Sequence, residues 1–372
     1  MRTTALFVFS AIVAASLAPV RVGAAGPAPC VTSTPACTEW VTLGGGPARS
    51  MIYRTHPLGV ANPDIHRAFI MVHGTNRNAD HYFATANAAA FLAGVRDDTL
   101  VIAPHFVSSD RGCMDKLEPN EVSWSCGGDS WRSGGSSTSD PKLASFDFVD
   151  QILRELANKK TFPNLRAIVV AGHSAGGQFV NRYEMANKVH DTLGVPVSYV
   201  VANPSSYAWP DAMRPLQEGD ATPEAAGKGW DKTEPHTNFT YGPFDPTKGS
   251  RLLDSTAPGR PAPNFDKWPF GLEDRTGGYT KGLTNDQLIK QLTSRPVTYL
   301  LSQVDTLPLG GFDSSANAMA QGATRRARGE AFVKYVNDTF HVQQKAIIVE
   351  ECGHNDRCVY TTDVVFPVIF PK

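Results

Sequence analysis

The feature that most constrains this fold is an apolar run that ends abruptly in the motif Gly-x-Ser-x-Gly. The run covers residues 165–171, and Ser174 then stands between Gly172 and Gly176. A segment with helical character, 176–189, follows directly. A Cβ atom on either side of the serine would clash in so tight a bend, which explains both glycines. The stretch therefore predicts a strand, a sharp turn and a helix, with the Ser174 hydroxyl exposed at the turn.

Short apolar runs alternate with helical segments along most of the chain. The apolar runs are 68–72, 100–103, 165–171, 197–202, 296–303 and 343–350, and the helical segments are 141–160, 176–189 and 316–335. This alternation is typical of βαβ units and of a parallel sheet that is buried on both faces. Two further strands, 39–43 and 48–55, flank three glycines and predict a hairpin at one edge of the sheet. We therefore expect one α/β domain over residues 26–372.

Two segments interrupt the alternation. Residues 203–295 are far too long for a connection between a helix and a strand, and they are rich in proline and aromatic side chains. Such a composition favours a lid or cap over a disordered segment. Residues 108–140 form a second insertion, in which Trp124 and Trp131 could line a pocket or pack into the insertion's own core.

The N-terminus has the pattern of a secretory signal peptide. A short basic start precedes an apolar run at 5–18, which is too short to span a bilayer comfortably, and small residues follow near Ala24 and Ala25. We expect residues 1–25 to be removed, which leaves a secreted extracellular or periplasmic protein with no stable membrane anchor. The alternative is an uncleaved anchor.

The six cysteines fit an exported protein, because disulfides persist in oxidising compartments. They form three pairs that are close in sequence: Cys30 with Cys37, Cys113 with Cys126, and Cys352 with Cys358. Six cysteines allow fifteen connectivities. We expect the local pairing, since short loops are easy to close.

Charge and motifs exclude several classes of function. The chain has 35 basic and 36 acidic side chains, so no electrostatic feature favours nucleic acid as a partner. It contains no Cys-x-x-Cys, Walker loop, Gly-x-Gly-x-x-Gly or His-Glu-x-x-His motif. We therefore expect no nucleotide or other cofactor and no metal.

Suitable partners for the serine follow later predicted strands. A serine hydroxyl becomes nucleophilic when a histidine takes its proton and a carboxylate orients that histidine. Asp305 lies at the end of the run 296–303, and His354 follows the last run. In a parallel sheet both positions lie at the carboxyl edge, near Ser174. Asp313 is the rival acid, and His173 is expected to pack behind the serine.

The turn at Ser174, the acid Asp305 and the histidine His354 occur in the order found in the α/β-hydrolase superfamily, which the chain resembles from the hairpin to the last helix. The resemblance implies a mostly parallel central sheet flanked by helices, with 203–295 as a lid or cap insertion. The serine turn and residues 265–328 also resemble secreted bacterial or fungal members, which are esterase- or lipase-like hydrolases of poorly defined substrate.

The oxyanion hole of such an enzyme needs two N–H donors. One is expected from Ala175, directly after the nucleophile and at the start of a helix. In α/β-hydrolases with His-Gly after the early strand, the next residue donates, which is Thr75 here, and the Asn76 side chain could assist. The alternative is that His73 and Gly74 only turn the chain.

These observations predict a secreted serine hydrolase that cleaves a small-molecule or polymeric carboxylic ester through an acyl-enzyme. One alternative is a serine peptidase or amidase on the same fold. The other is a binding protein that has kept the fold without catalysis. Cys352 and Cys358 flank His354, so their disulfide would restrain the loop that carries the catalytic base.

Overall fold

An eight-stranded sheet forms the centre of the computed structural model, which describes residues 28–110, 112–127, 130–216, 239–248, 260–275 and 277–372. Residues 1–25, the predicted signal peptide, lie outside these ranges. The strand order is β1-β2-β4-β3-β5-β6-β9-β10. The strands are β1 (Thr38–Thr42), β2 (Arg49–Arg54), β3 (Arg67–Val72), β4 (Thr99–Pro104), β5 (Ala167–His173), β6 (Val197–Ala202), β9 (Val297–Ser302) and β10 (Lys345–Val349).

The sheet is parallel except at one edge. There β1 pairs antiparallel with β2, and β2 pairs antiparallel with β4, as the sequence predicted for an edge hairpin. The other neighbours pair in parallel, with Val170 of β5 opposite Ile70 of β3 and Tyr199 of β6. This arrangement confirms the predicted fold class.

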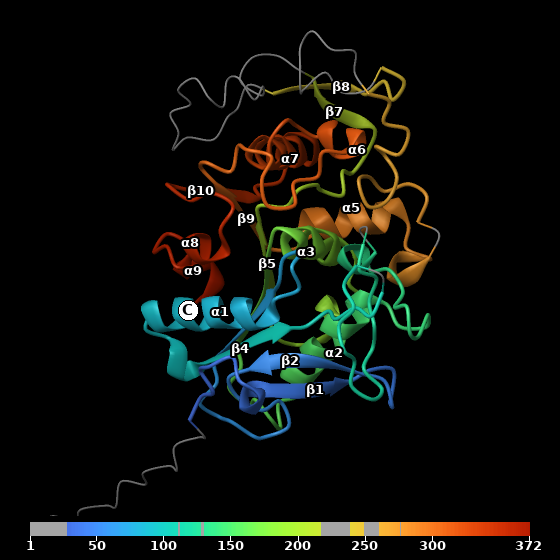
Figure 1. Ribbon diagram of the computed structural model, residues 1–372. Helices are drawn as coiled ribbons and strands as arrows, with labels where there is room; N and C mark the ends of the chain where they lie inside the picture. Colours follow the sequence, from blue (N-terminus) through green and yellow to red (C-terminus); the bar gives the residue numbers. More distant parts are fainter. Residues whose placement is uncertain (1–27, 111, 128–129, 217–238, 249–259, 276) are drawn as a thin grey trace, which may run out of the picture.

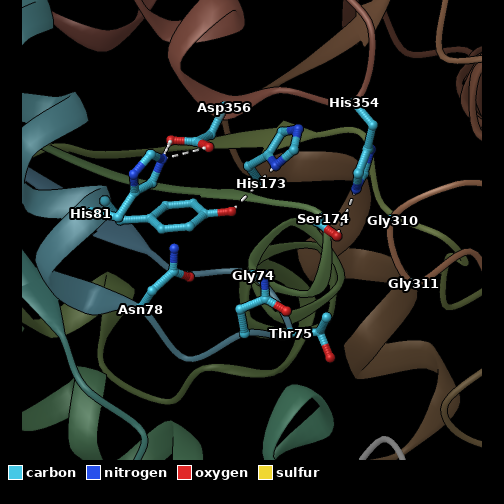
Figure 2. A pocket seen from close by; sticks show the side chains of 12 residues that line it. Gly74, Thr75, Asn78, His81, His173, Ser174, Gly310, Gly311, His354 and Asp356 are labelled. Carbon is cyan, nitrogen blue, oxygen red and sulfur yellow. Dashed lines mark hydrogen bonds and ion pairs between the residues drawn. The ribbon is translucent and has the colours of Figure 1, made fainter.

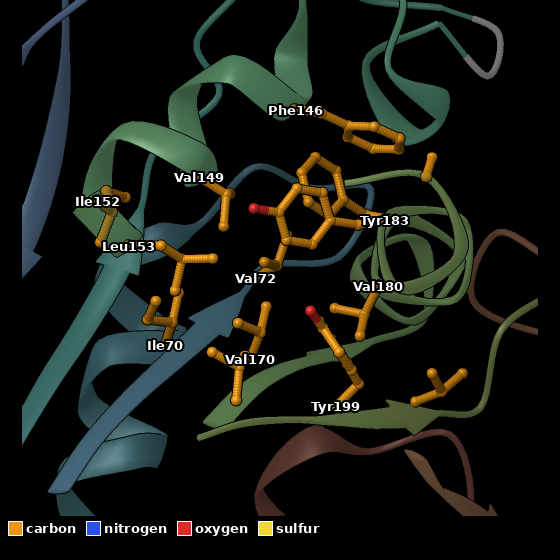
Figure 3. Packing of buried hydrophobic residues seen from close by; sticks show 14 of the residues in the cluster. Ile70, Val72, Phe146, Val149, Ile152, Leu153, Val170, Val180, Tyr183 and Tyr199 are labelled. Carbon is orange, nitrogen blue, oxygen red and sulfur yellow. The ribbon is translucent and has the colours of Figure 1, made fainter. Parts of the chain in front are cut away.

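Helices cover both faces of the sheet. Ile70 and Val72 of β3 point into one core, whereas Phe69 and Met71 point into the other, because successive side chains of a strand alternate between faces. The first core also contains side chains of α2 (Ser145–Leu156), α3 (Ala175–Ala186), α5 (Asn285–Ser294) and α7 (Arg325–Phe340). Figure 3 shows α2 and α3 packed against β3 and β5 in this core.

The second core is closed by α1 (Ala79–Leu92), α8 (Asp356–Tyr360) and α9 (Phe366–Ile369). These three helices lie together on the opposite side of the sheet from α2, α3 and α5 (Figure 1). Strands that are buried on both faces read as continuous apolar runs, which is why the sequence located them.

The single helix predicted over 316–335 is wrong. The structure has the short helix α6 (Ala316–Met319) and then the separate helix α7. Gly322, with φ of +144°, interrupts the chain between them. The Thr324 side chain accepts a hydrogen bond from the N–H of Ala327 and starts α7 as its N-cap.

The insertion at 203–295 is less uniform than the sequence predicted. Its last part is α5, whose Leu288 and Leu292 are buried in the main core beside α3, so this part flanks the sheet. Its first part contributes the two-stranded sheet of β7 (Met213–Leu216) and β8 (Thr240–Pro243). Trp209 and Tyr241 of the insertion pack on Tyr335 of α7. A lid role for the insertion stays a prediction, since residues 217–238, 249–259 and 276 lie outside the description.

Three disulfides join the cysteines in the expected local pairs: Cys30–Cys37, Cys113–Cys126 and Cys352–Cys358. None of the helices in the described ranges has the length and apolar character that crossing a membrane requires.

Candidate active site

The turn between β5 and α3 forces Ser174 into an unusual backbone conformation, with φ of 59° and ψ of −119°. A Cβ at Gly176 would lie 2.1 Å from the carbonyl oxygen of Val72, and one at Gly172 would lie 2.2 Å from the carbonyl oxygen of Gly176. The turn therefore tolerates only glycine at both positions. Strain of this kind in a residue other than glycine is characteristic of functional sites.

The structure brings the three residues that the sequence singled out into one hydrogen-bonded line. The Nε2 atom of His354 lies 2.9 Å from the Oγ atom of Ser174 (Figure 2), and the Nδ1 atom of His354 lies 2.7 Å from Asp305 Oδ2. Asp305 follows β9 and His354 follows β10, so the parallel sheet places both beside the end of β5. Asp313, the rival acid, instead accepts a hydrogen bond from the N–H of Ser315.

Asp305 is held by a buried arginine that the sequence did not connect with this acid. Arg325, the first residue of α7, has its Nη1 atom 3.3 Å from Asp305 Oδ1. Its Nε donates to Ser205 Oγ at 2.8 Å, and its Nη2 donates to the carbonyl of Gly310 at 2.9 Å. Burial lowers the pKa of Arg325, and the charge of Asp305 opposes that shift.

The loop after β3 is fixed by a neutral histidine. The Nδ1 of His73 donates to the carbonyl of Gly74 at 2.8 Å, and its Nε2 accepts from the N–H of Phe106 at 3.1 Å. Burial lowers the pKa of His73 to about 3, so the ring is uncharged at neutral pH. Thr75 therefore follows an anchored turn.

The two residues expected to form the oxyanion hole both lie near Ser174. A Cβ built on Gly74 would be 3.6 Å from the Cβ of Ser174, so the loop that carries Thr75 passes close to the serine. Ala175 is the first residue of α3, where N–H groups have no acceptor within the helix. Their role as donors stays a prediction.

His173, which the sequence analysis expected behind the serine, packs beside His354. Its ring centroid lies 4.6 Å from that of His354, and its Nδ1 lies 3.3 Å from the Tyr82 hydroxyl. Burial first, and the neighbouring His354 second, lower the pKa of His173 well below its usual value. His173 is therefore a neutral neighbour of the Ser174–His354 pair.

A pocket of about 330 Å³ opens at Ser174 (Figure 2). The described residues that line it are Gly74, Thr75, Asn76, Asn78, His81, Tyr82, His173, Ser174, Gly310, Gly311, His354 and Asp356. None of them has an aliphatic side chain beyond the threonine methyl. Trp124 and Trp131 do not line the pocket; they are buried in the main core of the domain and not in a separate core of the insertion.

The sequence reasoning missed several neighbours of the serine. Asn78, His81 and Asp356 lie in the pocket wall, although only the closeness of Asp356 to His354 in the chain could have indicated this. Throughout the ranges that the structure describes, no three His, Cys, Asp or Glu side chains gather in a way that could hold a metal ion.

Comparisons with known proteins agree with this architecture. A sequence profile described as alpha/beta hydrolase family matches residues 69–364. No curated protein matches the chain in sequence. Among solved structures, a poly(3-hydroxybutyrate) depolymerase from Bordetella parapertussis is similar, with 19% identity, a TM-score of 0.54, and coverage of 88% of this chain and 89% of that one. A poly(aspartic acid) hydrolase from Sphingomonas sp. KT-1 has 17% identity, a TM-score of 0.55, and coverage of 87% and 95%.

Identities this low establish a shared fold and nothing about substrates. The profile, in contrast, covers well over half of the chain, including most of β3, the serine turn and His354. The chain therefore belongs to the alpha/beta hydrolase family.

Proposed function

We propose that this hydrolase is a serine enzyme that cleaves carboxylic esters through an acyl-enzyme. The observation that carries the proposal is the line of hydrogen bonds from Ser174 through His354 to Asp305, built on a strained strand-to-helix turn. This geometry matches what a serine nucleophile requires: a base within reach of the hydroxyl, and a carboxylate that orients the base.

In the proposed reaction, Ser174 Oγ attacks the ester carbonyl while Nε2 of His354 takes its proton. Asp305 accepts the hydrogen bond from Nδ1 and stabilises the imidazolium that forms. The N–H groups of Ala175 and Thr75 bind the oxyanion of the tetrahedral intermediate. His354 then protonates the leaving alcohol, and water resolves the acyl-enzyme by the same steps in reverse order.

Labelling with a fluorophosphonate tests the nucleophile. The wild-type protein should lose activity with one equivalent of probe, and mass spectrometry should find the adduct on Ser174. The Ser174→Ala variant should not react, whereas Ser314→Ala, a change at an exposed serine, should label like the wild type. No adduct on the wild type, or equal labelling of Ser174→Ala, would falsify the serine mechanism.

The bond type needs its own comparison, because the names of the two structural neighbours cover a polyester and a polyamide. We expect p-nitrophenyl esters to be hydrolysed with kcat/KM at least 100-fold above that for matched p-nitroanilides. Comparable values for the two series would favour the amidase alternative.

We also propose that the protein is exported. The three disulfides agree with an oxidising compartment. N-terminal sequencing of the protein recovered from the culture medium or periplasm should begin close to residue 26. An intact N-terminus in a membrane fraction would indicate the uncleaved anchor instead.

A further inference from the structure

The pocket has a polar wall on the side away from the Ser174–His354 pair. Figure 2 shows His81, Asn78 and Asp356 on that side, whereas His354, Gly310 and Gly311 lie on the other side of the serine. The position of Gly310 is independently clear, since a Cβ built on it would be 3.0 Å from His354 Cδ2.

The two sides of the pocket therefore contact different parts of an ester, the alcohol and the acyl chain. The leaving alcohol takes its proton from His354 Nε2 and so must lie on the side of His354. The acyl chain, which stays attached to Ser174, then extends toward Asn78 and His81. The polar wall is therefore the surface that an acyl chain contacts.

Asn78 is the N-cap of α1, yet its side chain makes no capping hydrogen bond. Asparagine at this position commonly bonds an N–H group of the first turn and stabilises the helix. Here the amide has no hydrogen-bond partner among the described residues, and it lines the pocket instead. Its donor and acceptor atoms are both available to a ligand.

His81 and Asp356 add further polar groups to the wall, which also contains Tyr82. His81 Nε2 lies 3.0 Å from Asp356 Oδ1, and Thr85 Oγ1 donates to Asp356 Oδ2 at 2.8 Å. Both carboxylate oxygens are thus engaged within the protein, and the carboxylate holds the imidazole in place. An alkyl chain laid against this wall would cover polar groups without replacing their contacts with water, which costs free energy.

We propose that Asn78 is a specificity-determining residue whose amide binds an oxygen atom carried by the acyl chain, so that the enzyme prefers hydroxyacyl esters to alkanoyl esters of the same shape. A hydroxyl can both donate to the amide oxygen and accept from the amide nitrogen. The inference rests on the proposed ester hydrolysis and names the acyl class for the same site.

The test uses an isosteric pair, p-nitrophenyl 3-hydroxybutyrate and p-nitrophenyl 3-methylbutyrate, which differ by a hydroxyl in place of a methyl group. Each kcat/KM is divided by the rate constant for alkaline hydrolysis of the same ester, which removes the difference in intrinsic reactivity. The wild type should favour the hydroxyl substrate about 3- to 10-fold, the range expected for one neutral hydrogen bond.

Asn78→Leu should reduce that ratio to about 1 or below, and because the ratio compares two substrates of the same variant, a general loss of activity does not change it. If the leucine variant folds poorly, Asn78→Ser provides a second test, because serine can cap α1. This variant should lower the ratio as well. Asn317→Leu, on α6 and outside the pocket lining, should keep the wild-type ratio.

A wild-type preference for the methyl substrate would overturn the inference, as would a ratio that Asn78→Leu leaves unchanged. Failure of the proposed function looks different, because then neither ester is cleaved and the fluorophosphonate finds no nucleophile.

Discussion

Removing the Cys352–Cys358 disulfide should impair catalysis beyond its effect on stability. The bond closes a loop with a sequence separation of 6, and this loop carries both His354 and Asp356. For a loop this short, the chain-entropy relation gives a loss of about 2.4 kcal/mol in the free energy of unfolding when both cysteines become alanine. In the folded protein the same bond restrains the loop that carries His354, whose two hydrogen bonds depend on its position.

The chain contains a matched control. Cys30–Cys37 has a sequence separation of 7, so its removal should cost about 2.5 kcal/mol by the same relation. Each bond joins one fully buried cysteine to one that is partly exposed. The two double variants should therefore lose similar stability, although only one of them alters the loop that carries His354.

Urea unfolding followed by circular dichroism measures the stability of each variant, and p-nitrophenyl acetate hydrolysis at 25 °C without denaturant measures activity. We expect Cys352→Ala/Cys358→Ala to lower kcat/KM by about 10- to 100-fold, since small displacements of catalytic groups have effects of this size. Cys30→Ala/Cys37→Ala should stay within twofold of the wild type. If both folded variants retain wild-type kcat/KM, the disulfide does not position His354 and the reasoning is wrong.

Three further changes test other parts of the structure. Gly176→Ala places a Cβ 2.1 Å from the carbonyl oxygen of Val72, so soluble expression should fall sharply and any folded protein should lose at least 100-fold in kcat/KM. Arg325→Met leaves the buried carboxylate of Asp305 without its cation. The free energy of unfolding, measured by urea titration, should fall by about 3–5 kcal/mol, and an unchanged midpoint would contradict the pairing. Burial raises the pKa of Glu184 from 4.5 to about 8, so the folded protein holds a proton that the unfolded chain releases, and stability should fall as pH rises between these values. Glu184→Gln should flatten that part of the pH–stability curve, and an identical slope in both proteins would exclude a buried neutral Glu184.

Local features of the sequence predicted much of the sheet and of the serine turn. Gly172 and Gly176 are required by contacts between residues that are near one another in the chain or in adjacent strands, so the motif and the apolar run before it were sufficient. Disulfides between cysteines separated by 6 to 13 positions were predictable for a related reason, because short loops close easily.

The predictions from the sequence differ from the structure where a glycine or a tertiary contact interrupts a local pattern. The apolar periodicity over 316–335 continues through Gly322. The positive φ of Gly322 and the N-cap at Thr324 nevertheless divide the segment into two helices. The long insertion was judged by its length, whereas α5 within it is a sheet-flanking helix whose Leu288 and Leu292 complete the main core.

The arginines at the start of α7 are an example of burial that the sequence did not predict. Arg325, Arg326 and Arg328 form a cluster of like charges, for which the expected environment is solvent. All three are buried in the structure, and Arg325 contacts Asp305. Arg326 pairs with Glu330 one turn further along α7, whereas nothing within the helix indicates the burial of Arg325, because its acidic partner comes from the loop after β9.

By itself the sequence determined which residues form the strands of the central sheet, where the chain must turn at Ser174, and that Asp305 and His354 follow later strands. Only the tertiary structure decided that Arg325 pairs with Asp305, and that His81 meets Asp356 across 275 positions. The physical reason is that sterics and hydrophobic periodicity act over a few residues. Contacts at the mouth of the pocket depend instead on how a parallel sheet aligns the carboxyl ends of strands that are far apart in the chain.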